Sequence, residues 1–257
     1  MARGLREYPS AALQAARLRL SLRGCNNARD TMNEKLTQVR VWDLPTRVFH
    51  WVLAFCVISS IISGLLGGNA LVWHFRLGYV VFTLLAFRLV WGLIGGHWSR
   101  FVNFIYAPAT TLRYLRGERR AGEHVDVGHN PLGAFSVFGL LGLLALQVGT
   151  GLFADDEIAS TGPLIKFVSG ATSLALTRWH KLSGQWFILT LVVLHVAAIV
   201  FYLVRKKHNL VRPMIRGDKA LPADVPASVD NARSRLLALV LLALCAGLVT
   251  WVISLGG

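Results

Sequence analysis

Two histidines lie within one apolar stretch of the chain, residues 178–207, which reads RWHKLSGQWFILTLVVLHVAAIVFYLVRKK. The stretch is long enough to cross a bilayer, because a spanning helix needs about 20 mostly apolar residues. Ionisable side chains are costly in lipid, so they mark candidate functional sites. His180 and His195 are 15 residues apart, which in an α-helix is about four turns and about 22 Å, so they share one face at two depths. That distance is too long for one metal ion, and it predicts two separate sites.

The composition places the chain among membrane proteins. Of its 257 residues, 54% are hydrophobic and only 16% are charged, which is too apolar for an ordinary soluble domain. The alternating segments typical of a membrane barrel are not seen, so helices are expected. Five segments are long and apolar enough to span: Val48–Leu66, Trp73–Ile94, Leu132–Phe153, Trp179–Val204 and Leu236–Leu255. We therefore expect an all-α integral membrane fold, in which a four-helix bundle carries the histidines and a fifth, C-terminal transmembrane helix is added.

The net charge of +14 comes from basic residues that lie between the apolar segments. This pattern indicates membrane topology and argues against nucleic acid as a partner. The loops at residues 95–131 and 205–233 are rich in Lys and Arg, whereas the loop at 154–178 carries the acidic triplet Asp155–Glu157. By the positive-inside rule the N-terminus and both basic loops are cytoplasmic, and the acidic loop and the C-terminus are periplasmic. The predicted location is a membrane, in contact with lipid, and the family resemblance given below implies that it is the bacterial inner membrane.

The first 31 residues hold six arginines and no apolar core of the kind found in a secretory signal. Three interpretations stay open: a basic amphipathic helix on the membrane surface, a disordered segment, or translation that begins at Met32. We divide the chain into a basic N-terminal extension (1–38), the core (39–219), and a connector with the fifth helix (220–257). The three cysteines are scattered and none lies in a CxxCH motif, which excludes covalent haem attachment.

Two further histidines, His50 and His74, lie near the ends of the first and second spans. A lone membrane histidine is commonly a hydrogen-bonded packing residue between helices, but four of them favour a functional site. The predicted topology places His74 and His180 near the periplasmic face, and His50 and His195 toward the cytoplasm. Depth therefore pairs His74 with His180 and His50 with His195, provided that the first span begins near Thr46 or the fourth continues into the cytoplasm.

Two facing imidazoles are a natural axial pair for a planar cofactor between helices, and six-coordinate haem b is the leading candidate. A bare Zn or Cu ion usually needs three or four ligands, and no Cys, Asp or Glu lies near these histidines along the helices. His74 and His180 both occur in the pattern W-H-x-x-x-G, which places Gly78 and Gly184 on the histidine face. A missing side chain there leaves room for the edge of a macrocycle or, alternatively, for close packing of two helices.

Four arginines are candidate partners for anionic haem propionates, which arginine binds by bidentate hydrogen bonds. Arg76 and Arg178 each lie two residues from a histidine at the outer end of a span, and Arg47 and Arg88 are the candidates at the inner site. For Arg47 and Arg178 the alternative is snorkelling toward the membrane interface.

The chain from about Val39 to Lys219 resembles the bacterial cytochrome b561 family, which includes the b-type cytochrome subunits of nickel–iron hydrogenases. The resemblance is carried by VRVWDLPTRVFHW, WHFRLGYVVFTLLAFRLVWGLIG, GHNPLG and the segment that begins WHKLSG and ends at Lys219. It implies a four-helix core that binds two b haems non-covalently. The implied ligand pairs are those that depth also predicts, His50 with His195 and His74 with His180.

The motif GHNPLG precedes the third span. Asn130 is predicted to cap that helix and Pro131 to open it. An alternative places His129 and Asn130 beside a quinone head group at the inner face.

Bis-histidine ligation fills both axial positions of a haem and leaves one-electron transfer as its chemistry. We expect electron transport across the bilayer between the quinone pool and a periplasmic partner, namely a cytochrome c, a hydrogenase or another dehydrogenase. Superoxide oxidation coupled to quinone reduction is an alternative, suggested by some members of the resembled family. A histidine-dependent proton or metal transporter would usually need carboxylates in its spans, and the predicted spans contain none. A purely structural anchor would leave four membrane histidines unexplained.

Overall fold

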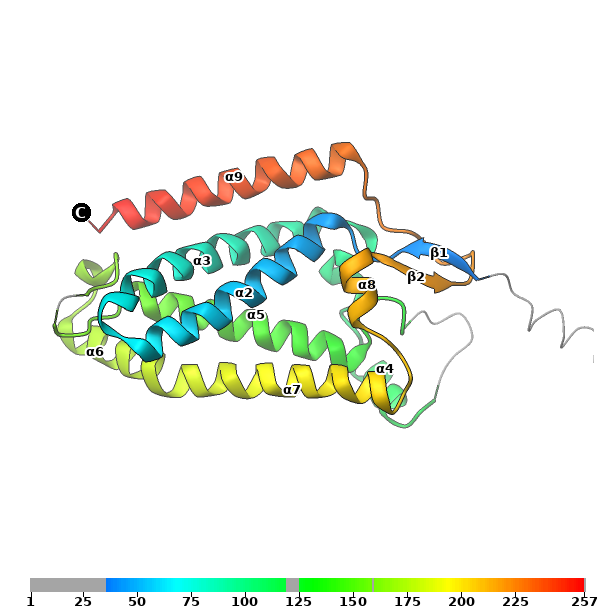
Figure 1. The fold of residues 1–257 in the computed structure, drawn as a ribbon, viewed down its shortest axis with the longest axis horizontal. Helices are drawn as coiled ribbons and strands as arrows, with labels where there is room; N and C mark the ends of the chain where they lie inside the picture. Colours follow the sequence, from blue (N-terminus) through cyan, green and yellow to red (C-terminus); the bar gives the residue numbers. More distant parts are fainter. Residues whose placement is uncertain (1–35, 119–124, 159, 257) are drawn as a thin grey trace, which may run out of the picture.

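Helices make up most of the structure, a computed structural model that describes residues 36–118, 125–158 and 160–256 (Figure 1). Most of the predicted N-terminal extension, with the alternative start at Met32, lies outside the described residues. The helices are α2 (Leu44–Leu66), α3 (Leu71–Ile94), α4 (Pro108–Leu115), α5 (Pro131–Leu152), α6 (Gly170–Arg178), α7 (Gln185–Val204), α8 (Val211–Arg216) and α9 (Ala232–Ser254). Two short strands, β1 (Thr37–Arg40) and β2 (Asp218–Leu221), and the π-helical segment η5 (Trp179–Gly184) are also present.

Five helical stretches of the described chain are long and apolar enough to cross a membrane. They are Leu44–Leu66, Gly68–Ile94, Pro131–Leu152, Gly170–Val204 and Ala232–Ser254. The predicted all-α membrane fold is therefore confirmed. The first span begins at Leu44, close to the start predicted near Thr46, and this places His50 inside its helix.

The helix that contains the fourth predicted span, Trp179–Val204, begins before Trp179. Its helical stretch covers 35 residues from Gly170 to Val204, because the Ser169 side chain caps the first turn by accepting a hydrogen bond from the Thr172 N–H. At about 1.5 Å per residue the stretch measures about 52 Å, against a hydrocarbon core of about 30 Å. The stretch is therefore longer than one span needs, and the predicted span Trp179–Val204 lies within it.

Two spans begin with a polar cap followed by proline. Asn130 accepts a hydrogen bond from the Gly133 N–H at 2.7 Å, and Pro131 opens α5, as predicted. At the start of α2, the fully buried Asp43 accepts from the Thr46 N–H at 2.8 Å. Asp43 also accepts from the Trp91 indole of α3 and from the Ser99 hydroxyl, so this cap joins two spans and the loop after them.

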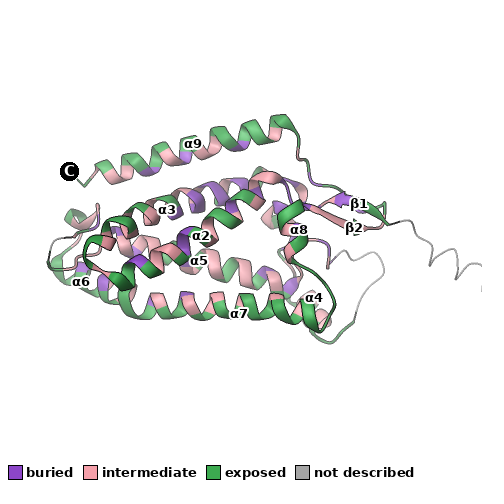
Figure 2. Ribbon diagram, in the orientation of Figure 1, coloured by how far each residue is buried: buried purple, intermediate pink, exposed green. Residues whose placement is uncertain are grey.

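The hairpin of α2 and α3 turns at Gly68–Ala70, α5 and α7 lie beside it, and α9 runs along α3 (Figure 1). Buried residues concentrate on α2 and α3, whereas α7 and α9 show long exposed faces (Figure 2). Those faces carry many exposed hydrophobic side chains, which suit contact with acyl chains. Cys56 and Cys245 are free thiols packed in apolar clusters, as expected.

One end of the bundle carries a small cap outside the spans. In it β1 and β2 pair antiparallel, with Thr37 opposite Leu221 and Arg40 opposite Asp218. The cap core contains the buried residues Val39, Val41, Trp42, Trp98, Val127 and Val225. The segment before the first span and the connector after the fourth thus lie on the same side of the bundle, as the predicted topology requires.

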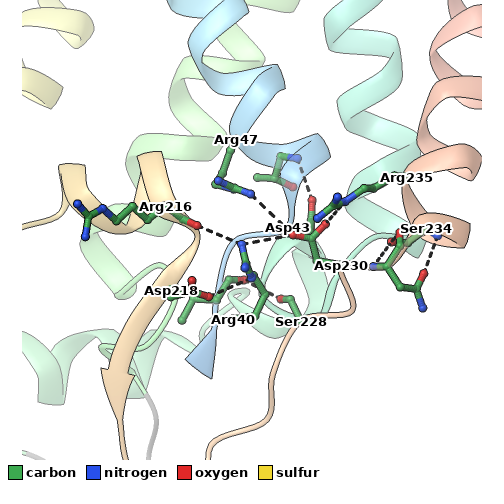
Figure 3. A network of polar contacts seen from close by, with 12 residues as sticks. Arg40, Asp43, Arg47, Arg216, Asp218, Ser228, Asp230, Ser234 and Arg235 are labelled. Carbon is green, nitrogen blue, oxygen red and sulfur yellow. Dashed lines mark hydrogen bonds and ion pairs between the residues drawn. The ribbon is translucent and has the colours of Figure 1, made fainter. Parts of the chain in front are cut away.

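Asp230, just before α9, joins three parts of this end (Figure 3). Its side chain is 4% exposed and lies 2.9 Å from Arg235, 3.4 Å from Arg40 and 3.7 Å from Arg47. The Arg47 guanidinium also donates to the Ile215 carbonyl in the last turn of α8 at 2.7 Å. Burial works to raise the pKa of Asp230, but the hydrogen bond from Arg235, the Leu44 N–H and the arginine charges outweigh it and hold that pKa below its usual value.

Replacing Asp230 with Asn should lower the free energy of unfolding by about 1.5–3 kcal/mol at neutral pH, because charged hydrogen bonds are lost. Since the folded pKa lies below the usual 3.8, the stabilisation is complete above that pH and disappears as pH falls through the folded value. Thermal unfolding in detergent as a function of pH measures both effects. The matched change Asp218→Asn removes a pair that is about one-third exposed and should cost about 0–1 kcal/mol. Equal losses from the two variants would contradict this account of Asp230.

Candidate functional site

The structure brings the four membrane histidines together as two pairs. The rings of His74 on α3 and His180 in η5 have centroids 5.8 Å apart and planes at 86°. The rings of His50 on α2 and His195 on α7 have centroids 6.4 Å apart and planes at 50°. Because a metal–imidazole bond is about 2 Å long, both separations suit two imidazoles that face each other across one metal ion. We call these the outer pair and the inner pair, after their predicted depths.

Both rings of the outer pair are oriented by backbone carbonyls. His74 Nδ1 donates to the Ser60 carbonyl at 2.8 Å, and His180 Nδ1 donates to the Gln147 carbonyl at 2.9 Å. A carbonyl only accepts, so the proton lies on Nδ1 and the Nε2 lone pair is left for a ligand bond. Metal-binding histidines show this second contact almost always.

The inner pair is held less tightly. His195 Nδ1 lies 3.4 Å from the Ser136 hydroxyl, and His50 Nδ1 is buried without a hydrogen-bond partner among the described residues. Within the same part of the chain no group of three or more His, Cys, Asp or Glu is placed to hold a metal ion. Two ligands per site fit an iron whose other ligands come from a macrocycle better than a bare Zn ion.

The two predicted glycines have different surroundings. A Cβ on Gly78 would meet no atom within 4 Å, which leaves open space one turn from His74. A Cβ on Gly184 would collide with the side-chain oxygen of Gln147, so this glycine makes room for Gln147. The sequence analysis missed Gly64 and Gly151, where a Cβ would lie 3.1 Å from His74 Nδ1 and 2.9 Å from His180 Cε1.

The four predicted arginines also differ in their contacts. Arg88 is 3% exposed, donates to the Ser99 carbonyl at 3.0 Å, and keeps one buried nitrogen, Nη1, without a partner among the described residues. Arg47 contacts α8 and Asp230, as described above. Arg76 and Arg178 are exposed, and Arg76 lies 5.1 Å from the Trp73 ring centroid. Arg88 and Arg47 thus each keep one buried nitrogen, Nη1 and Nε, without a hydrogen-bond partner among the described residues, and Arg88 is the more deeply buried of the two.

His129 lies directly before α5, next to the inner pair. Its ring contacts Trp42 and Phe104, with centroids 4.7 and 4.6 Å away. Burial lowers the pKa of His129 to about 3, and the positive charge of Arg88 adds to this, so the ring is neutral at pH 7. Its Nδ1 is buried without a hydrogen-bond partner in the described part of the chain.

A chain of polar side chains that the sequence analysis missed lies beside His129. Asn130 donates to the Tyr202 hydroxyl at 2.8 Å, and this hydroxyl lies 3.0 Å from that of Tyr114. Tyr114 in turn donates to Asp126 at 3.3 Å. The residues come from α4, α7 and the loop before α5, so only the fold reveals that they are neighbours.

The spans and the paired histidines define a multi-pass membrane protein of the cytochrome b class. The sequence model of the prokaryotic cytochrome b561 family matches residues 41–217, more than half of the chain. The chain therefore belongs to this family, and membership implies haem b as its cofactor. The predicted resemblance is confirmed.

Curated relatives are similar over most of their length. A probable Ni/Fe-hydrogenase B-type cytochrome subunit of Bradyrhizobium diazoefficiens is 26% identical over 216 residues, 70% of this chain and 85% of the relative. The corresponding subunit of Cupriavidus necator is 24% identical over 241 residues, 81% of this chain and 97% of the relative. A probable Ni/Fe-hydrogenase 1 B-type cytochrome subunit of Escherichia coli K12 is 23% identical over 211 residues, 69% of this chain and 88% of the relative. No solved structure gives a significant match.

Alanine substitutions at Gly78 and Gly184 distinguish a glycine that leaves space for a cofactor from a glycine that is needed for helix packing. Gly184→Ala should lower protein stability by about 0.5–1.5 kcal/mol, because its Cβ pushes the Gln147 amide away from its hydrogen bond with the His180 carbonyl. Gly78→Ala has open space and should leave the fold as stable or about 0.5–1 kcal/mol more stable, while haem content falls if a macrocycle edge uses that space. Thermal unfolding and the haem-to-protein ratio, measured on both variants, check this. Equal destabilisation by the two alanines would contradict the assignment.

Proposed function

We propose that this chain binds two b haems, one between the rings of each histidine pair, and carries electrons across the bilayer. The observation that carries the proposal is the outer pair: two imidazoles from different spans each bond a backbone carbonyl through Nδ1, which leaves the Nε2 lone pair for a ligand bond, and their ring centroids lie 5.8 Å apart. Two sites about 22 Å apart along one helix make a path through most of the hydrocarbon core. Haem, when bound, supplies reversible one-electron redox chemistry.

The residues of this chain orient the ligands and balance charge. Ser60 and Gln147 hold a proton on Nδ1 of the outer histidines through their carbonyls. At the inner end Arg88 offers an unpartnered buried Nη1, which suits a propionate oxygen. Burying the Arg88 guanidinium away from water costs free energy. Its attraction to a propionate that is also removed from water would offset that cost.

A hydrogenase is the periplasmic partner that the relatives favour, since they are named as hydrogenase cytochrome subunits. A cytochrome c or another dehydrogenase would use the same end of the bundle. The acidic loop lies at that end, and its Asp156 carboxylate caps the Ile158 and Ser160 N–H groups at 3.0 and 2.8 Å. The acidic triplet favours a basic docking face on the partner at this point, while the exposed Arg76 and Arg178 at the same end favour acidic groups beside it.

The quinone pool is proposed to meet the opposite, inner end. His129 supports this, because a neutral imidazole with a buried, unpartnered Nδ1 is available to a quinone oxygen beside the inner pair. Asn130 is engaged as the cap of α5 and with Tyr202, so His129 is the better candidate for direct contact.

Single histidine substitutions test the ligand pairs. His74→Ala should remove only the outer haem and His195→Ala only the inner one, because the two pairs have no histidine in common. Reduced-minus-oxidised spectra with haem-to-protein ratios then fall from two to one in both variants. A chain that keeps two haems after either change would rule out the corresponding ligand.

Replacing His129 with Phe tests the quinone contact. The phenyl ring keeps the packing against Trp42 and Phe104 while the ring nitrogens are lost, so quinone reduction should slow about 10-fold or more, as expected for loss of a positioned proton-transfer group. The visible spectrum of both haems should not change, and this serves as the control for intact folding. Unchanged turnover with quinone would dismiss His129 from this role.

A further inference from the structure

Gln147 on α5 holds His180 at two points. Its side-chain Nε2 donates to the His180 carbonyl at 2.8 Å, and its backbone carbonyl accepts from His180 Nδ1 at 2.9 Å. The Thr150 hydroxyl donates to that same Gln147 carbonyl at 3.0 Å. One residue of a neighbouring helix therefore fixes both the backbone and the ring of His180.

The local backbone is built around this contact. His180 lies in the π-helical segment η5, a rare conformation that occurs frequently at functional sites. Gly184 is buried, and a Cβ there would collide with the Gln147 side-chain oxygen. Gly151 lets α5 approach the ring, since a Cβ there would lie 2.9 Å from His180 Cε1. Glycines on both helices thus permit the Gln147–His180 contact.

The contact fixes the angle between the two outer rings. His74 is held by the Ser60 carbonyl at 2.8 Å, His180 by Gln147, and their planes stand at 86°. The inner rings, at 50°, have no comparable pair of carbonyl contacts in the described structure. The angle between two axial imidazole planes governs the anisotropy of the low-spin ferric haem signal in electron paramagnetic resonance, so the two sites should be distinguishable.

We propose that the Gln147 side chain is a positioning group: its hydrogen bond to the His180 carbonyl fixes the η5 backbone so that the His180 ring meets the residue-147 carbonyl and stands perpendicular to His74 at the outer haem. The inference rests on the proposed di-haem function and adds a residue that is neither a ligand nor a propionate partner. Gln147 acts through His180, in the way that outer-shell partners generally fix the ring orientation of a metal-binding histidine.

The variant Gln147→Met tests this role, because methionine keeps the length and helix preference of glutamine but has no amide donor. One of the two low-spin ferric signals should lose its strong anisotropy while the other stays unchanged. Haem should also leave the altered site more readily, with affinity lower by about 10-fold or more. Gln185→Met is the matched control: the same change in the first turn of α7, expected to leave both signals as they are.

The outcomes separate this inference from the function on which it rests. A parent protein without haem would overturn the proposed function itself. A parent with two haems, and a Gln147→Met variant with both signals unmoved, would overturn the role of the Gln147 side chain alone, since the variant keeps the backbone carbonyl that accepts from His180 Nδ1. If Gln147→Met loses the outer haem entirely, the variant Gly184→Ala provides the second test of the Gln147 role. The added Cβ displaces the Gln147 amide from the His180 carbonyl, while the glutamine itself is kept. The same loss of anisotropy in Gly184→Ala supports the role, and an unchanged signal overturns it.

Discussion

Bringing two imidazoles from separate helices to within about 6 Å of each other is the requirement that organises this bundle. In lipid an unpaired polar group has no water to bind, so a buried ring nitrogen is costly unless the fold supplies a partner. At the outer pair, carbonyls of Ser60 and Gln147 do so, at 2.8 and 2.9 Å. These carbonyls belong to α2 and α5, whereas the rings that they orient belong to α3 and η5. The hydrogen bonds therefore require α2 to lie close to α3, and α5 close to η5.

The two ends of the bundle hold their helices together by different kinds of contact. The outer end relies on close helix approach, with glycines where α2 and α5 meet the rings. The inner end relies on a buried polar network, in which Asp43 receives hydrogen bonds from Thr46, Trp91 and Ser99 while Arg88 donates to the Ser99 carbonyl. The cap of β1, β2 and α8 covers this end and is tied to α2 through Arg47.

Much of this arrangement follows from the sequence, because lipid leaves few alternatives to helices. Hydropathy located the spans, and the depth of each histidine predicted which ones meet. The π-helical segment was not predictable, since WHKLSG carries no signal that distinguishes it from a continuing α-helix. The extension of this helix back to Gly170 was not predicted either, because GATSLALTR is less apolar than the stretch that follows it. The four-residue strands were too short to recognise. Gln147, Gly64 and Gly151 were missed because their roles depend on which helix lies opposite, and no periodicity within one helix contains that information.

Membership of the prokaryotic cytochrome b561 family and the two histidine pairs support one account, a wire of two haems across the membrane. The account depends above all on how many haems one chain binds. The most direct measurement is a reduced-minus-oxidised visible spectrum of the intact purified protein, calibrated as haem per polypeptide. Two b haems per chain is the predicted result, and one haem or none would contradict it.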